Sequence, residues 1–171
     1  MYKIGDYIIY GTKGVCRVVQ IGPVDLPDVP SDRLYYTLEL TGSRNSRVFT
    51  PVDNSKVIMR PVLTQEEASA LIAEIRNLTE IEIEDEKHRE DAYRDVIRSC
   101  DCRELVRIIK TLYQRNQSRL AEGKKITSSD DKYFHLAEDN LYSELAISLD
   151  IPREEVKDYI MDHLEGTAEV C

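Results

Sequence analysis

The chain has 171 residues, of which 42% are hydrophobic, and its formal net charge is −9. This length accommodates one ordinary domain or two small ones, and the hydrophobic fraction is sufficient for globular cores in either case. No apolar run reaches the ~18 residues of a membrane-spanning helix, and the first residues lack the apolar core of a signal peptide, so we expect a cytoplasmic protein.

Apolar and polar side chains alternate in the first third of the chain, and this period predicts short β-strands. The expected strands are residues 6–10, 15–21, 34–40, 47–50 and 56–59. Segments rich in Gly, Pro, Asn and Ser separate them, as turns require. This many short strands in so short a segment favours a small, strongly bent β-barrel of the SH3 or Tudor type.

The hydrophobic period changes to that of an α-helix at Thr64, where Thr64-Gln-Glu-Glu67 has the form of a capping box. Apolar residues at helical spacing then predict helices that begin near residues 64, 86, 101, 127 and 152. The acidic segment 80–86 has no clear apolar face, so we expect either a connector or a frayed helix end there. We therefore expect an α+β chain, with an SH3/Tudor-like β-barrel in residues 1–62 and an all-α domain of four to five helices in residues 63–171.

Charge is distributed unevenly along the helical half. Residues 63–86 contain one basic and 8 acidic side chains, and residues 126–171 contain 3 and 12. Between them, residues 87–125 contain 11 basic and 6 acidic side chains. The middle of this half is thus a cationic island in an acidic chain, and local cationic density is what phosphate binding needs.

Several of these cations are candidates for contact with nucleic acid. Because successive helical residues turn by about 100°, Arg103, Arg107 and Lys110 fall within a narrow stripe. Four others extend the positive surface past the helix end: Arg115, Arg119, Lys124 and Lys125. Such groups can contact phosphates without reading bases. They also suit the solvated face of an amphipathic helix and its negative C-terminal dipole, so both interpretations stay open.

On the barrel, the candidate interaction element is the strand that contains Phe49. Its candidate residues are Arg44, Arg47, Val48, Phe49 and Thr50. A small barrel with an imperfectly closed sheet offers unpaired backbone groups to a partner strand, and an exposed Phe49 would add an apolar anchor. Alternation does not decide whether Phe49 faces outward, because Val48 and Phe49 are both apolar.

The sequence contains no Gly-rich phosphate loop, no His-Glu-x-x-His and no Gly-x-Ser-x-Gly. Of the four cysteines, Cys16, Cys100, Cys102 and Cys171, the close pair has one intervening residue instead of the two usual in zinc knuckles. We therefore expect no enzymatic activity, no metal and no cofactor, and thiols that stay reduced.

Four segments together carry a family resemblance. The opening, Ile4-Gly-Asp-Tyr-Ile-Ile-Tyr-Gly-Thr-Lys-Gly-Val15, combines a hydrophobic-Gly-Asp element with a strand, a tyrosine and a Gly-containing turn. The others are residues 48–54, 105–119 and 137–146. In this order they resemble the CarD/CdnL family of bacterial transcription regulators, over most of residues 1–149.

The resemblance implies that the barrel binds the β-subunit lobe of RNA polymerase, partly by strand addition. It also implies that the helical domain contacts promoter DNA, without sequence specificity, at the upstream edge of the transcription bubble. Such proteins stabilise the open promoter complex. A protein that binds melted promoter better than closed promoter shifts the opening equilibrium by its difference in affinity, with no chemistry of its own.

The chain departs from the family at one position. Family members commonly place a tryptophan wedge just ahead of the second helix of the helical domain, and this chain has no tryptophan. The corresponding segment is residues 86–89, in which Lys87 and Arg89 can pair with phosphates but cannot prop open a base step. We expect a weaker, or differently signed, effect on open-complex lifetime than in members with the aromatic.

One alternative function stays open. The chain could be a polymerase- or repair-associated protein-interaction module without DNA contact, because the same barrel type occurs in transcription-repair coupling factors. Salt distinguishes the two, since phosphate contacts give an affinity that falls steeply with added salt and an apolar helical interface does not.

Overall fold

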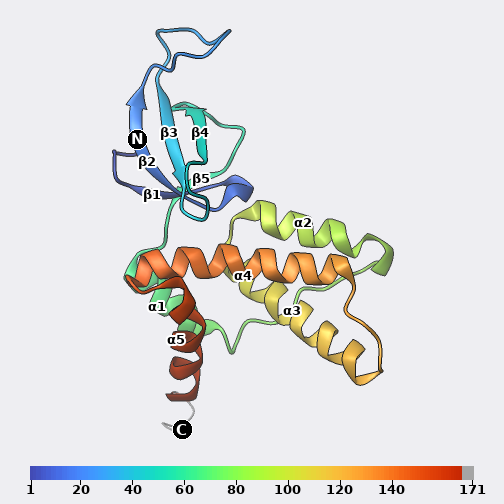
Figure 1. Ribbon diagram of the computed structural model, residues 1–171. Coiled ribbons are helices and arrows are strands. Elements are labelled where there is room, and N and C mark those ends of the chain that lie inside the picture. Colours follow the sequence, from blue (N-terminus) through green and yellow to red (C-terminus); the bar gives the residue numbers. More distant parts are fainter. Residues whose placement is uncertain (167–171) are drawn as a thin grey trace. The chain divides into compact units, whose positions relative to one another are not determined.

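The computed structural model describes residues 1–166, and the chain divides into two units, the first of which is Met1–Val62 and the second of which begins at Leu63 (Figure 1). Each unit has a hydrophobic core of its own. Within the described residues, the first unit is an antiparallel sheet of five strands and the second contains five α-helices. The predicted α+β fold class is therefore confirmed.

The strand order in the first unit is β4-β3-β2-β1-β5. The strands are β1 (Tyr7–Tyr10), β2 (Val15–Gly22), β3 (Tyr35–Leu40), β4 (Arg47–Pro51) and β5 (Met59–Pro61). The first four lie within one residue of the predicted bounds, but the prediction of a strand at 56–59 is wrong. Residues 51–56 instead form a turn, in which Asn54 N–H donates to Pro51 O at 3.0 Å and Asn54 Oδ1 accepts from Lys56 N–H at 2.8 Å.

The core of the sheet is small. It consists of fully buried side chains from three strands: Ile8, Cys16, Val18, Tyr36 and Leu38. Burial raises the pKa of Cys16 to about 11, so this thiol stays protonated at neutral pH and packs as a small apolar group. A register shift between Val18 and Gln20 marks a bulge, which bends β2 over this core.

The helices of the second unit are α1 (Gln65–Glu74), α2 (Arg89–Ser99), α3 (Cys102–Ala121), α4 (Ser128–Leu149) and α5 (Arg153–Gly166). Side-chain caps fix three of their starts. Thr64 and Glu67 form the predicted capping box, Asp101 accepts from the amides of Arg103 and Glu104, and Thr127 accepts from the amide of Asp130.

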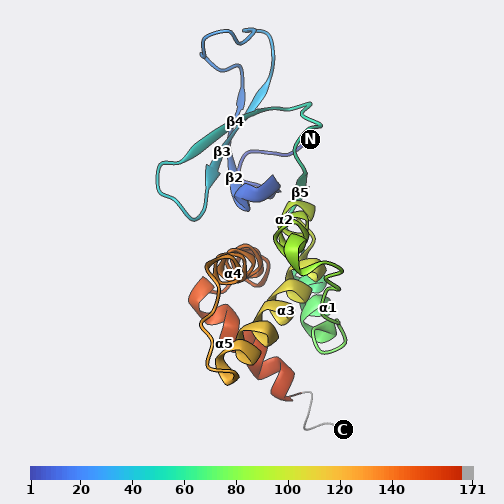
Figure 2. The ribbon, with the colours of Figure 1, turned by 90° about the vertical axis from the view of Figure 1, so that its right-hand side faces the viewer.

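The long helices α3 and α4 pack against each other, and α2 packs beside both. Figure 2 looks almost along α4, with α2, α3 and α5 around it. Between α1 and α2 the chain has no regular helix until the short 3₁₀ turn η2 (Glu86–His88), so the connector predicted at 80–86 is confirmed up to Asp85.

Cys16, Cys100 and Cys102 are buried and none of them forms a disulfide, whereas Cys171 lies outside the described residues. Within residues 1–166, none of the helices has the length and apolar composition required to cross a bilayer.

Gly11 gives a test of the sheet unit. Its φ is +48°, and a Cβ built on it would lie 2.8 Å from Val57 Cγ1. Both the left-handed backbone and the contact oppose a side chain, so Gly11→Ala should lower the free energy of unfolding by about 1–3 kcal/mol in urea denaturation. Gly42→Ala is the matched control, because nothing lies within 4 Å of its added Cβ. Equal losses in the two variants would contradict this account of Gly11.

Candidate functional site

β4 forms one edge of the sheet and pairs only with β3 among the described residues. The backbone bonds Leu40 N–H to Ser46 O and Val52 N–H to Leu34 O, both 3.1 Å long, flank the paired region. Bonding residues alternate along an antiparallel pair, so Val48 and Thr50 bond to β3. The N–H and C=O groups of Arg47 and Phe49 therefore point away from the sheet, as a partner strand would need.

The side chains of β4 alternate in the same way between the protein surface and the core of the sheet. Phe49 is 43% exposed, and Arg47 and the preceding Arg44 are exposed as well. Val48 packs against the sheet core, and Thr50 is buried, with its Oγ1 accepting from Asn54 Nδ2 at 2.7 Å. The structure thus answers the question that alternation left open: Phe49 lies on the outer surface, beside a free row of backbone groups.

In the helical unit, a buried carboxylate brings three helices together. Asp130, near the start of α4, has no exposed surface. Its Oδ2 accepts from Arg115 Nε of α3 at 2.7 Å, and its Oδ1 accepts from Arg89 Nε of α2 at 3.3 Å and from the Tyr93 hydroxyl at 3.1 Å. Burial opposes its charge, but the hydrogen bond from Arg115, followed by that from Thr127, holds the pKa of Asp130 below its ordinary value.

The same cluster keeps Tyr93 protonated. Burial, and then the charge and hydrogen bond of Asp130, raise the pKa of Tyr93 to about 12, so its hydroxyl remains a donor. Arg115 also reaches Glu86 of η2, whose two oxygens lie 3.1 and 2.9 Å from Nη1. The turn η2 is therefore tied to α3 and, through Asp130, to α4.

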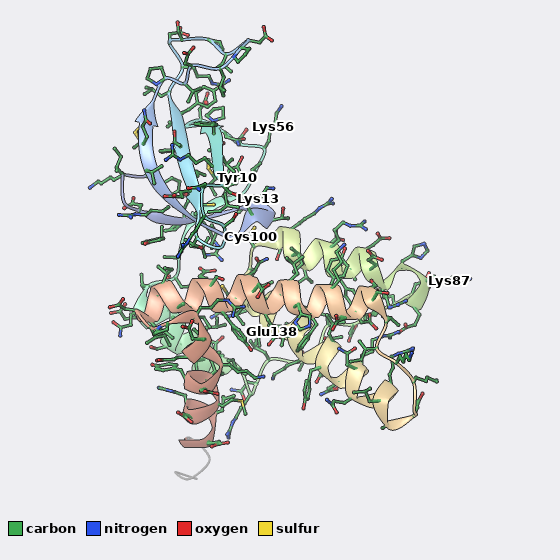
Figure 3. All side chains as sticks on the ribbon, viewed as in Figure 1. Tyr10, Lys13, Lys56, Lys87, Cys100 and Glu138 are labelled. Carbon is green, nitrogen blue, oxygen red and sulfur yellow. The ribbon has the colours of Figure 1, made fainter. Side chains whose placement is uncertain are left out.

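Lys87 lies in this turn, at the outer edge of the helical unit (Figure 3). Asp85 caps the turn by accepting from the Lys87 amide at 2.9 Å, and its other oxygen lies 2.7 Å from His88 Nδ1. The contact with His88, followed by the amide, lowers the pKa of Asp85. The Lys87 side chain is exposed, and its ammonium has no ion-pair partner among the described residues.

The stripe of Arg103, Arg107 and Lys110 has internal partners. Arg103 donates to both oxygens of Glu74, at 2.9 and 3.2 Å. Arg107 donates to the carbonyls of Thr79 and Glu80, at 3.0 and 3.2 Å, and Lys110 Nζ donates to those of Ile75 and Leu78. These three side chains hold the connector after α1 against α3, and contact with DNA stays a prediction for them.

The cations beyond α3 are arranged by the turn that joins α3 to α4. Arg119 Nε donates to Lys125 O at 2.9 Å, and Lys124 Nζ lies 2.7 Å from Glu122 Oε2. Lys125 is exposed, and within residues 1–166 its ammonium has no ion-pair partner. Among the described residues, Lys87 and Lys125 are thus the two predicted DNA-contacting residues whose side chains make neither an ion pair nor a hydrogen bond.

The candidate site residues predicted from the sequence do not include Asp130 or Tyr93. The sequence nevertheless contains a pattern that indicates a buried Asp130. Residues 130, 133, 137 and 141 share one face of α4, and the last three are buried apolar or aromatic residues. An acidic residue on an otherwise apolar helix face predicts a buried cationic partner.

Comparison with known families agrees with the two units. Residues 2–63 match the model of the CarD-like/TRCF RID domain, and residues 70–161 match that of the CarD C-terminal domain. No curated protein matches the chain significantly.

Asp130→Asn tests the buried cluster. Removing the charge leaves Arg89 without its anion and Arg115 with Glu86 as its only one, and we expect a loss of about 3–5 kcal/mol in the free energy of unfolding at pH 7. Asp131→Asn is the matched control, since Asp131 is exposed.

The loss of stability in Asp130→Asn should depend on pH in one direction. The folded-state pKa of Asp130 lies below its ordinary 3.8, so its stabilisation is complete above that pH and is lost as the pH falls through the folded-state value. The difference between wild type and variant should therefore shrink in denaturation series carried down to about pH 3. A difference independent of pH would show that the charge of Asp130 is not what stabilises the unit.

Proposed function

The chain belongs to the family of CarD-like proteins, and on that premise we propose that it docks on the β-subunit lobe of RNA polymerase through β4 and contacts promoter DNA through the turn before α2. The family consists of regulatory and interaction domains and identifies an RNA polymerase-interacting transcription factor. The subunit, the DNA contact and the residues are our proposal, and the free edge of β4 with Phe49 exposed on it is the observation that carries it.

Strand addition at β4 has both components that this mode of recognition uses. The backbone groups of Arg47 and Phe49 supply main-chain hydrogen bonds to an extended partner segment. The Phe49 ring supplies apolar area, and aromatic side chains commonly dominate the energy of an interface. Arg44 and Arg47 add positive charge beside the edge, which favours an acidic partner segment.

Contact with promoter DNA is proposed for the end of the helical unit where η2, the last turn of α3 and the start of α4 converge. Lys87 and Lys125 would bind phosphates directly, because their ammonium groups are exposed. Arg89, Arg115, Arg119 and Lys124 are bound to neighbours there and contribute mainly to the local potential. Phosphate contacts of this kind position a protein without reading sequence.

Weak intrinsic affinity for DNA is compatible with this function. The net charge of −9 opposes binding to free DNA. A polymerase-bound chain, however, holds its DNA-contacting residues close to the promoter, and the high local concentration compensates for weak contacts. Preference for the melted promoter over the closed one would then shift the opening equilibrium.

Phe49→Ala tests the polymerase interface. Because Phe49 is 43% exposed and lies outside the sheet core, the variant should lose little stability, whereas its affinity for RNA polymerase should fall by about tenfold or more, the effect of an interface anchor. The measurement is titration of labelled full-length chain with polymerase. Leu26→Ala removes a similarly exposed apolar side chain in the β2–β3 connection and is the control. Undiminished binding of Phe49→Ala would rule out β4 as the docking edge.

Lys87→Ala and Lys125→Ala test the DNA contact. Each should weaken the association of the chain with a polymerase–promoter complex and reduce the slope of log K against log salt by about 1, the value for one lost phosphate contact. Each should also bring the open-complex lifetime closer to its value without the chain. Lys157→Ala on α5 removes the same charge elsewhere and should change neither. If the slope for the wild type is already the same with and without promoter DNA, the chain is a protein-interaction module and makes no DNA contact.

A further inference from the structure

The outer face of the sheet carries a row of charged and aromatic side chains. Arg17 of β2 lies opposite Tyr7 of β1 on one side and opposite Glu39 of β3 on the other. Glu39 in turn lies opposite Arg47 of β4. Directly opposed residues of an antiparallel pair share a face of the sheet. These four side chains therefore cross the sheet in one line, on the face opposite to the core residues that alternate with them.

A small pocket lies on this face, with a volume of about 210 Å³. Its lining includes three members of the row and two residues of the β3–β4 connection: Tyr7, Arg17, Glu39, Ser43 and Arg44. Backbone hydrogen bonds order that connection, since Leu40 N–H donates to Ser46 O at 3.1 Å and Thr41 N–H donates to Val15 O at 3.2 Å. Pockets for drug-sized ligands occupy about 300–1,000 Å³, so this smaller pocket suits a single functional group.

The two arginines at the pocket are unpaired. Most arginines of the described residues form an ion pair or donate to a backbone carbonyl. Arg17 and Arg44 are exposed and do neither within residues 1–166. The Arg17 guanidinium lies 5.9 Å from the centre of the Tyr7 ring, and stacking of this kind leaves its N–H edge free to donate. Both guanidinium groups therefore keep their donors for an external anion.

Glu39 limits which anion can enter. It stands opposite Arg17 and Arg47, yet its carboxylate forms no ion pair with either of them among the described residues. A carboxylate accepts hydrogen bonds and donates none, so it repels a neighbouring anion unless that anion carries a proton to donate. Hydrogen phosphate carries such a proton, whereas sulfate, an ionised carboxylate and the phosphodiester of nucleic acid do not. The mixed lining thus favours a protonated phosphate group.

The number of donors also favours phosphate over a carboxylate. One guanidinium fork is enough to occupy both oxygens of a carboxylate. A phosphate group has further oxygens, which can accept from a second guanidinium and from a hydroxyl group. The pocket supplies both, because the Tyr7 hydroxyl makes no hydrogen bond within the described part of the chain.

We propose that this pocket binds a protonated phosphate group, with Arg17 and Arg44 donating to its oxygens and its P–OH donating to the Glu39 carboxylate. The group is the free hydrogen phosphate ion or the phosphate of a small ester such as a mononucleotide. The pocket shares Arg44 with the proposed docking surface but does not include Phe49 or the backbone edge of β4. Its test uses no polymerase, so its failure would leave the proposed function untouched.

Inorganic phosphate and sulfate test the selectivity, each added to the ¹⁵N-labelled full chain at about pH 6 and equal ionic strength. Sulfate has the greater charge at this pH, so attraction by the arginines alone would favour it. We expect phosphate to shift the amide signals of residues 17 and 39–44 saturably, and sulfate to bind at least tenfold more weakly. Shifts that do not saturate, or sulfate binding as tight as phosphate binding, would overturn the proposal.

AMP distinguishes the two sources of the phosphate group. Its second pKa of about 6 leaves part of the ester protonated under these conditions. Tighter binding of AMP than of inorganic phosphate at the same amides would assign the pocket to an ester, and weaker binding would assign it to the free ion.

Two variants separate the roles of the charged side chains. Arg17→Gln should weaken phosphate binding at least tenfold and leave the Tm unchanged, because the side chain is exposed. Arg98→Gln, which removes another exposed arginine on α2, should change neither. Glu39→Gln supplies an amide that can donate to either anion, so the preference for phosphate over sulfate should disappear. Phosphate binding unaltered in Arg17→Gln, or a preference retained in Glu39→Gln, would contradict the proposal.

Discussion

The helical unit depends on one buried charge, the carboxylate of Asp130. A carboxylate with no exposed surface is tolerated only where cations and hydrogen-bond donors surround it, and here Arg89, Arg115 and Tyr93 supply them. Since these partners come from α2 and α3, the requirement to satisfy one side chain fixes three helices at the same end of the unit. Through Arg115 and Glu86 it also fixes η2, so that Lys87 extends from a rigid base and not from a free loop.

A second set of ion pairs explains why charge along the sequence differs from charge on the surface. The segment 63–86 is strongly acidic and the following one is basic, and α3 uses its cations to hold the connector between α1 and η2. Arg103 binds Glu74, while Arg107 and Lys110 bind backbone carbonyls of residues 75–80. Much of the cationic island is therefore engaged in ion pairs or hydrogen bonds within the unit, and few of its described side chains are left without such a contact.

Features that depend on residues close together in the sequence could be predicted, whereas features that depend on distant residues could not. The Thr64 capping box, the alternation in β1–β4 and the change of period after residue 62 are local patterns, and they gave the fold class correctly. The turn at Asn54 displaced the last strand, because a side-chain hydrogen bond there competes with the extended backbone that Val57 and Ile58 favour. The helical spacing of Asp130 with Tyr133 and Ala137 indicates that its carboxylate is buried, but it does not identify the partners, because the cluster joins residues 15 to 41 positions apart.

The two proposed contacts of the transcription factor differ in kind, and this difference assigns them different roles. An edge strand offers directional backbone hydrogen bonds and an aromatic anchor, which are retained at physiological salt and determine which partner is bound. Exposed lysines offer screened, non-directional attraction that decays over about 8 Å and would bind any phosphate. In a chain with a net charge of −9, the second contact is effective only once the first has placed the chain at a promoter. On the proposed function, the sheet unit would decide where the chain is located, and the helical unit would bias the equilibrium between closed and melted DNA there.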